Sequence, residues 1–209
     1  MVVTVWILGD QILRKHPALT AAEQQVNKDQ LVVLMIESQA RARRLPYQRK
    51  KLVLLFSAMR HYAEQLRSSG FQVDYRISPG TAIAIKQHLQ AYQPEIIYTM
   101  AASEFGGRRF QQHLERQFNI PVNFLPNTQF LTSRFNPYPD PLPDKRYVQE
   151  QFYRKMRQHF NLLMQTDSEP IGGRWNFDKD NRRSLPKSAQ PSRPISFEPD
   201  EITTAVMEE

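Results

Sequence analysis

The chain has 209 residues, 40% of them hydrophobic, so it can bury a core in one large domain or in one domain with an appendage. Twenty-eight Lys and Arg against 21 Asp and Glu give a net charge of +7, which favours an anionic partner such as nucleic acid without requiring one. The lack of cysteine excludes disulfides, a cysteine nucleophile and iron–sulfur ligation within these residues, and it fits a reducing cytoplasm.

The first predicted strand runs from Val2 to Leu8 and is rich in β-branched and aromatic residues. It lacks the basic segment and cleavage site of a secretory signal, and no stretch of the chain is long and apolar enough to predict a membrane helix. Gly9, Asp10 and Gln11 follow at the strand's carboxyl end, where glycine permits a close backbone approach. The polar segment from Ile12 to Asp29 predicts a loop and a short helix.

Leu31 to Ile36 is a run of six apolar residues, which predicts a strand buried on both faces of a parallel sheet. Glu37 and Ser38 follow where open α/β sheets place their ligand crevice. If the first two strands are neighbours, the carboxylates of Asp10 and Glu37 line one crevice and can accept hydrogen bonds from a flat heterocycle or from sugar-like hydroxyls. An equally open alternative is that Asp10 caps the next helix while Glu37 pairs with an arginine.

A basic segment separates this strand from the next helix and contains Arg41, Arg43, Arg44, Arg49 and Lys50. Apolar residues at helical spacing then predict a long amphipathic helix, with a stripe made of Leu52, Leu55, Phe56, Met59, Ala63 and Leu66. We expect Arg60, Glu64 and Arg67 on the outer face of this helix, spaced to pair along its surface.

Three further strands are predicted over Phe71 to Ile77, Glu95 to Thr99 and Ile120 to Phe124. Helices are expected between them, one entered through Ser78-Pro79-Gly80 and ending near Tyr92, the other from Arg108 to Phe118. This alternation predicts an α/β fold over residues 1–130, a doubly wound, Rossmann-like parallel sheet of five strands with the first strand in the centre.

Residues 131–209 are expected to form a linker that is extended apart from one helix. Four prolines between Asn136 and Pro143 predict an extended loop, and apolar spacing predicts a helix from Tyr147 to Met164. The stretch from Gly172 to Arg183 is expected to be ordered, with Trp175 and Phe177 packed against the sheet's helices. The last residues predict the start of another helix, with Thr203 or Thr204 as its cap.

Several familiar catalytic patterns are absent. The chain has no G-x-G-x-x-G after its first strand, no P-loop and no G-x-S-x-G nucleophile elbow. Its five histidines lie far apart and show no metal-ligand spacing. The sequence therefore predicts neither catalytic residues nor metal ligands.

Several segments resemble the N-terminal region of the deoxyribodipyrimidine photolyase-related proteins, the bacterial cryptochrome and (6-4) photolyase group that carries an iron–sulfur cluster. The segments are WILGDQIL, the stretch from VLMIESQARARRLPYQRKK to GFQVDY, FLTSRFNPYP, FYRKMRQHFNLLM and GGRWNFDKDNRRSLP. They cover nearly all of the chain, and their length makes the resemblance specific.

The resemblance implies an antenna domain that binds 6,7-dimethyl-8-ribityllumazine at the ends of the first two strands. Asp10 and Glu37 match the residues that hold the ring and ribityl chain, and four others match by position: Gly9, Gln11, Ser38 and Tyr47. It also implies a downstream helical domain, in the same or a separate chain, that binds FAD, an iron–sulfur cluster and DNA. None of that domain is expected here, so these residues alone are expected to be inactive in light-dependent repair.

Two alternatives remain. The first is a stand-alone α/β nucleotide or nucleic-acid binding module that uses the basic segment 41–51, with Arg41, Arg43, Arg44, Arg182 and Arg183 as candidate contacts. The second is a partner-docking domain that uses Trp175 and Phe177 as its interface.

Overall fold

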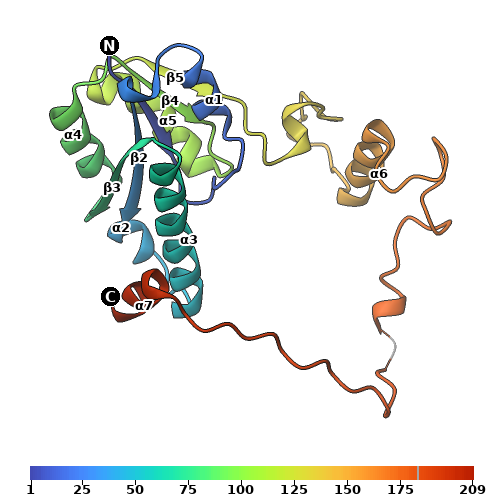
Figure 1. Cartoon of the computed structure of the whole chain (residues 1–209). Coiled ribbons are helices and arrows are strands. Elements are labelled where there is room, and N and C mark those ends of the chain that lie inside the picture. The colour runs from blue at the N-terminus through green and yellow to red at the C-terminus, as the bar shows by residue number, and fades with distance from the viewer. Residues whose placement is uncertain (183) are drawn as a thin grey trace. The chain divides into compact units, whose positions relative to one another are not determined.

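The computed structural model describes residues 1–182 and 184–209. Five parallel strands form one sheet in the order β3-β2-β1-β4-β5 (Figure 1). Their bounds are Val3–Ile7 for β1, Leu31–Ser38 for β2, Gln72–Ser78 for β3, Ile96–Met100 for β4 and Val122–Leu125 for β5. The predicted parallel α/β sheet with a central first strand is confirmed.

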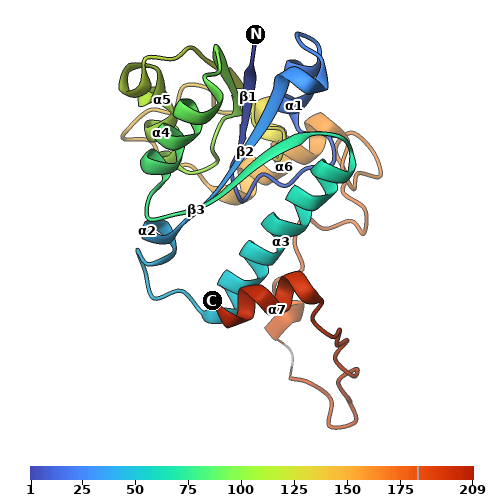
Figure 2. The same ribbon diagram turned by 60° about the vertical axis from the view of Figure 1, so that its left-hand side comes forward.

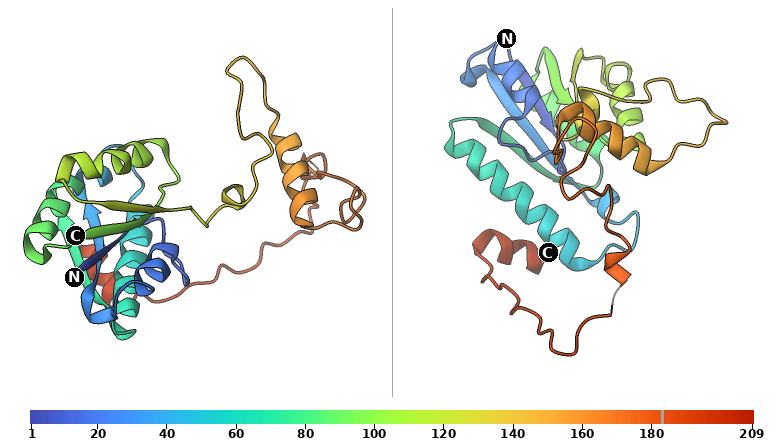
Figure 3. Two further views of the ribbon diagram at one scale, coloured as in Figure 1. Left: turned by 90° about the horizontal axis from the view of Figure 1, so that it is seen from above. Right: turned by 90° about the vertical axis from the view of Figure 1, so that its right-hand side faces the viewer.

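Helices cover both faces of the sheet (Figure 3, left). Helices α1 (Pro17–Glu23) and α3 (Arg49–Ser68) pack on one face, against odd-numbered residues of β1 and β2 such as Val5 and Met35. Helices α4 (Thr81–Tyr92) and α5 (Phe105–Phe118) cover the other face, against Trp6 and Leu34. The chain changes faces after β3, so the strand order reverses between β1 and β4.

Two helix starts differ from the prediction. Helix α5 begins at Phe105, three residues earlier than expected, because Gly106 and Gly107 continue into its first turn. Close packing explains the second glycine, since a Cβ at Gly107 would lie 2.8 Å from the Cβ of Ala102. At α4, the Ser78-Pro79-Gly80 entry predicts Ser78 as the cap, but Gly80 occupies the N-cap position without a side-chain bond and Ser78 is the last residue of β3.

The structure groups Met1–Gln129 with Glu198–Glu209 in one compact unit, and Phe130–Phe197 in a second. The C-terminal helix α7 (Glu201–Glu208) packs on α3, so α3 lies between the sheet and α7 (Figure 2; Figure 3, right). Its N-cap is Asp200, which accepts a hydrogen bond from the Thr203 backbone N–H, so the prediction of a threonine cap was wrong. An aspartate outcompetes threonine here because its carboxylate also favours the positive end of the helix dipole.

We expect Val206→Ala to loosen α7 from α3, because Val206 is the one buried residue of this helix. Losing its two methyl groups removes about 1 to 2 kcal/mol of burial free energy. Amide hydrogen exchange across α7 should accelerate roughly tenfold, whereas Met207→Ala, at a half-exposed neighbour, should leave it nearly unchanged. Equal effects of the two variants would contradict this packing.

Among its described residues, the second unit contains α6 (Gln149–Phe160), short 3-10 turns at Leu131–Ser133 and Asp180–Arg182, and otherwise turns and irregular chain. The predicted helix is confirmed but ends four residues early, because Asn161 takes a left-handed conformation and ends it. Leu163 therefore does not continue the apolar stripe of the helix.

Trp175 lies over α6, with the guanidinium groups of Arg154 and Arg157 at 5.2 and 5.4 Å from the centre of its ring. Its packing against the sheet's helices stays a prediction, because those helices belong to the other unit. Phe177 is half exposed and is stacked by Arg174 from its own loop. Cation–π contact to nearby arginines explains this choice of partner.

Among the described residues, no helix is long and apolar enough to cross a membrane.

Candidate functional site at the carboxyl edge of the sheet

Asp10 lies where the strand order reverses, in the loop that follows β1 and beside the loop that follows β4. Its side chain is exposed, and its Oδ2 accepts a hydrogen bond of 3.2 Å from the Ser103 hydroxyl. In open parallel sheets this reversal opens a crevice at the carboxyl ends of the strands. Asp10 therefore presents a solvated acceptor at the place where such folds bind ligands.

Gln11 is fully buried next to Asp10 and fastens the loop to β4. Its Nε2 donates to the backbone carbonyls of Met100 and Ala101, each at 3.1 Å. Its Oε1 is buried and has no hydrogen-bond partner in the part of the chain that the structure describes. Gly9 lies against Met59, whose Sδ would be 2.6 Å from an added Cβ, so any larger residue here would make the Met59 side chain shift.

The loop after β5 supplies two residues that sequence reasoning missed. Gln129 donates from Nε2 to the Asp10 carbonyl at 2.5 Å, and Asn127 donates to the Ala101 carbonyl at 2.9 Å. The Asn127 side chain also accepts from the Gln129 N–H at 2.9 Å, which fixes the turn. The signal was the P-N-T sequence directly after a predicted strand, a turn at the same carboxyl edge.

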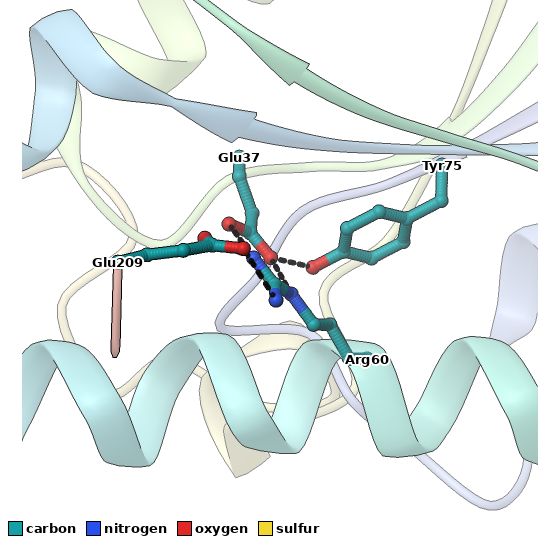
Figure 4. Close-up of polar contacts among 4 residues, drawn as sticks. All are labelled: Glu37, Arg60, Tyr75 and Glu209. Atoms are coloured by element: carbon teal, nitrogen blue, oxygen red, sulfur yellow. Dashed lines mark hydrogen bonds and ion pairs between the residues drawn. The ribbon is translucent and has the colours of Figure 1, made fainter. Parts of the chain in front are cut away.

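Glu37 is 4% exposed and faces α3. The alternation along β2 explains this direction, because Leu31, Val33 and Met35 face the same side. Its Oε1 accepts a hydrogen bond of 2.9 Å from Nε of Arg60, and its Oε2 accepts one of 3.1 Å from Nη2 (Figure 4). The hydroxyl of Tyr75, from the neighbouring strand β3, also donates to Oε1.

Arg60 was predicted on the outer face of its helix, and this prediction was wrong. Its side chain is 16% exposed and lies between Glu37 and α7, where it also donates to both carboxylate oxygens of Glu209 (Figure 4). Helix α7 covers the face of α3 that would otherwise meet solvent. The predicted pairing of Glu64 with Arg67 on that helix is confirmed.

The charges of this cluster shift two pKa values. Hydrogen bonds to Glu37 and then to Glu209 raise the pKa of Arg60, which stays charged. Burial, followed by the hydrogen bond to Glu37, raises the pKa of Tyr75, so its hydroxyl keeps its proton and remains a donor. Glu37 thus accepts three hydrogen bonds, which leaves about one of a carboxylate's four acceptor positions unused.

Asp10 lies in the loop after β1 and Glu37 near the end of the adjacent strand β2, yet the structure gives them separate partners. Asp10 contacts the loops after β4 and β5, whereas Glu37 contacts α3 and β3. Glu37 therefore pairs with an arginine, as one of the two alternatives proposed. Asp10 does not cap a helix, because the cap position of α1 belongs to His16.

The remaining predicted residues lie at the end of β2 and in the segment that follows it. Ser38 caps the short helix α2 (Gln39–Ala42) by accepting from the Arg41 N–H at 3.4 Å. The Arg41 guanidinium pairs with Glu104 at 3.0 Å, which ties this segment to the loop after β4. Tyr47 is partly exposed, with Nζ of Lys51 at 5.4 Å from its ring centre. Arg43 and Arg44 are exposed.

Arg182 is exposed at the end of a 3-10 turn, and Arg183 lies outside the described residues. Over residues 1–182 and 184–209, no three His, Cys, Asp or Glu side chains are grouped so that they could hold a metal ion.

Thr4, His88 and Asp74 form a hydrogen-bonded row that resembles a catalytic triad. Nε2 of His88 lies 2.7 Å from Oγ1 of Thr4, and Nδ1 lies 2.6 Å from Oδ2 of Asp74. Burial would raise the pKa of Asp74, but hydrogen bonds from His88 and Arg76 outweigh it and lower that pKa. Thr4 and His88 are fully buried in the middle of the sheet and under α4, where no substrate reaches them, so the row supports the core.

Comparison with known proteins gives two relatives and a family. A sequence profile described as deoxyribodipyrimidine photo-lyase-related protein matches residues 5–209. The chain is 34% identical over 211 residues to a (6-4) photolyase of Agrobacterium fabrum, a match that covers 98% of this chain and 40% of that protein. An uncharacterized protein of Acanthamoeba polyphaga mimivirus is 22% identical over 153 residues, covering 65% of this chain and 71% of that protein. The chain thus spans about two fifths of the length of the photolyase that it matches.

Proposed function

This chain belongs to the deoxyribodipyrimidine photo-lyase-related protein family, and we propose that it is the light-harvesting, antenna-binding domain of a photolyase-type flavoprotein. The family implies flavin and antenna cofactors in general. We propose 6,7-dimethyl-8-ribityllumazine as the antenna, held at the carboxyl edge of the sheet. Once bound, this group would absorb near-ultraviolet and blue light and pass the excitation energy to a flavin.

One observation carries the proposal. An exposed carboxylate, Asp10, lies beside a buried acceptor without a partner among the described residues, Gln11 Oε1, at the reversal of a parallel sheet. Both groups accept hydrogen bonds, and a ribityl chain or a ring N–H donates them. These residues therefore fit the chemistry of the proposed ligand.

The other candidate residues would act around this pair. Gly9 keeps the backbone close to α3, and Ser38 and Tyr47 belong to the segment that borders the same edge. Glu37 has about one acceptor position left, so its main role would be to hold Arg60 and Tyr75 in place. We propose that a helical flavin domain, in the same or a separate chain, is the partner that receives the energy and contacts DNA.

Reconstitution with the lumazine tests the site. Asp10→Ala is expected to weaken retention of the added lumazine about 5- to 150-fold, which corresponds to roughly 1 to 3 kcal/mol for an acceptor removed from a ring or hydroxyl donor. Glu37→Gln should weaken retention less than Asp10→Ala. The glutamine keeps the shape of the side chain, and the weaker pair with Arg60 would affect the lumazine only indirectly. Absorbance of the protein after gel filtration measures retention.

Asp29→Asn is the matched control, because this exposed carboxylate precedes β2 at the opposite edge of the sheet. It should leave retention unchanged. Equal retention in Asp10→Ala and in wild-type protein would show that Asp10 does not hold the lumazine.

A second candidate function rests on the exposed basic segment 41–51. Arg43, Arg44 and Lys50 are exposed there, and such a segment can contact phosphates. If this is the function, the chain binds duplex DNA with a steep salt dependence, and charge reversal at Arg43 and Arg44 abolishes that binding. Binding of the lumazine without DNA binding would favour the antenna function instead.

A further inference from the structure

The second unit carries a hollow of about 490 Å³ whose walls include Tyr153, Leu163, Ile171, Trp175 and Phe177. Three of these apolar residues are exposed: Leu163 at 65%, Ile171 at 57% and Phe177 at 45%. A cluster of exposed apolar side chains around one concavity marks an interaction site, unlike scattered single residues. No residue of the proposed antenna site takes part in this hollow.

The backbone at Leu163 supports the same conclusion. Leu163 has a φ of +55°, in the left-handed region that a side chain with a Cβ rarely adopts. Such a conformation is strained, and here it holds a leucine out into solvent, which is unfavourable as well. Both features are explained if the exposed leucine is a contact residue.

The hollow is preformed by one buried arginine. Arg157 is 7% exposed and donates from Nε to the Leu162 carbonyl at 2.9 Å, from Nη1 to the Tyr153 hydroxyl at 3.2 Å, and from Nη2 to the Leu163 carbonyl. The Ile171 N–H donates to the same Leu163 carbonyl at 2.9 Å, which sets Ile171 beside Leu163. A rigid hollow loses little entropy when a partner fills it.

The charge of the unit indicates what kind of partner fits. Residues 130–197 contain twelve Lys and Arg and seven Asp and Glu, so this unit holds most of the chain's positive excess. A second copy would bring like charge to like charge, which disfavours self-association. Aromatic residues and arginine are also the residue types enriched at the centres of protein interfaces.

We propose that this hollow docks an acidic protein segment that inserts a bulky apolar side chain. Nucleic acid fits less well, because two walls of the hollow are aliphatic. The aliphatic walls Leu163 and Ile171 match a leucine or phenylalanine anchor, whereas a base would stack on aromatic rings alone.

Trp175 allows a direct test, because the chain has only two tryptophans and Trp6 is 4% exposed in the core. In a Trp6→Phe background, Trp175 emission is followed while a synthetic helical peptide is added, with leucine and phenylalanine on one face and glutamate on the other. We expect a saturable blue shift. Leu163→Asp should weaken binding at least tenfold, whereas Leu185→Asp, at a 79% exposed leucine outside the hollow lining, should not.

Two further peptides complete the design. Replacing the apolar residues of the peptide with alanine, or its glutamates with lysine, should each remove the shift. The proposal is overturned if the acidic peptide gives no shift up to about 1 mM, or if Leu163→Asp and Leu185→Asp affect its binding alike. It is also overturned if only a single-stranded oligothymidylate shifts the emission, which would indicate nucleic-acid binding. Sedimentation that shows dimerisation of the chain through Leu163 would overturn it as well.

Discussion

Arg60→Met is expected to lower the free energy of unfolding by about 3 to 5 kcal/mol, measured by urea denaturation, because it leaves the Glu37 carboxylate buried without its cation. Glu37 is 4% exposed, and Tyr75 would be the single remaining donor among the three hydrogen bonds that it now accepts. The contact of Arg60 with the exposed Glu209 contributes far less, since solvent screens it.

The Arg60 effect has a matched control and a rescue. Arg67→Met removes another arginine of α3 that pairs with an exposed glutamate, and it should cost less than about 1 kcal/mol. In the double variant Glu37→Gln/Arg60→Met the buried charge is gone, so the loss should be smaller than in Arg60→Met alone. Equal losses in Arg60→Met and Arg67→Met would show that Glu37 is not an ion-pair partner in solution.

His16 is expected to make the protein acid-sensitive. Its ring is 1% exposed, neither ring nitrogen has a hydrogen-bond partner among the described residues, and burial lowers its pKa from 6.5 to about 4. Between these values the unfolded chain binds a proton that the folded protein does not, so stability falls as the pH falls from 6.5 to 4. The shift corresponds to about 3 kcal/mol.

His16→Met removes this titration while it keeps an apolar side chain at the site. Urea denaturation from pH 7 to pH 4.5 should show a shallower loss of stability in His16→Met than in wild-type protein. His113→Gln, at an exposed histidine of α5, should follow the wild-type curve. Parallel curves for His16→Met and wild type would mean that His16 titrates normally in the folded state.

The strands could be predicted because each carries a strong local signal. Leu31 to Ile36 is apolar at every position and too short for a lone amphipathic helix, which favours a strand covered on both faces, and glycine or proline marks most of the turns. The carboxyl edge could be predicted as well, because Asp10 and Glu37 directly follow such strands. The strands and the carboxyl edge of the sheet can be predicted because the residues that determine them are close together in the sequence.

The partners at the site could not be predicted in the same way. Arg60 lies beside the core residue Met59 but off the apolar stripe of α3, so the sequence alone places it on the outer face of the helix. That face becomes an interior one only because α7, some 140 residues later in the chain, docks on it. Tyr75 belongs to an alternating strand whose register pairs it with Met35, so its hydroxyl reaches Glu37 two residues further along the same face of β2. A period-2 reading of β2 could have shown that Glu37 faces α3, because it continues the series Leu31, Val33 and Met35.

The hollow of the second unit had a partial signal. Trp175 and Phe177 were recognised as a candidate interface, but Leu163 was placed inside the helix predicted from Tyr147 to Met164. The change of direction at Asn161 depends on Arg157 reaching past the helix end to the Leu162 and Leu163 carbonyls. No local pattern in the sequence carries that information.

The antenna function is tested most directly by an equilibrium titration of the purified chain with 6,7-dimethyl-8-ribityllumazine, read by the fluorescence anisotropy of the lumazine. We expect saturation at one lumazine per chain, with a higher dissociation constant in Asp10→Ala and an unchanged one in Asp29→Asn. Anisotropy that stays at the value of free lumazine, in protein whose far-ultraviolet circular dichroism shows a folded α/β domain, would contradict it.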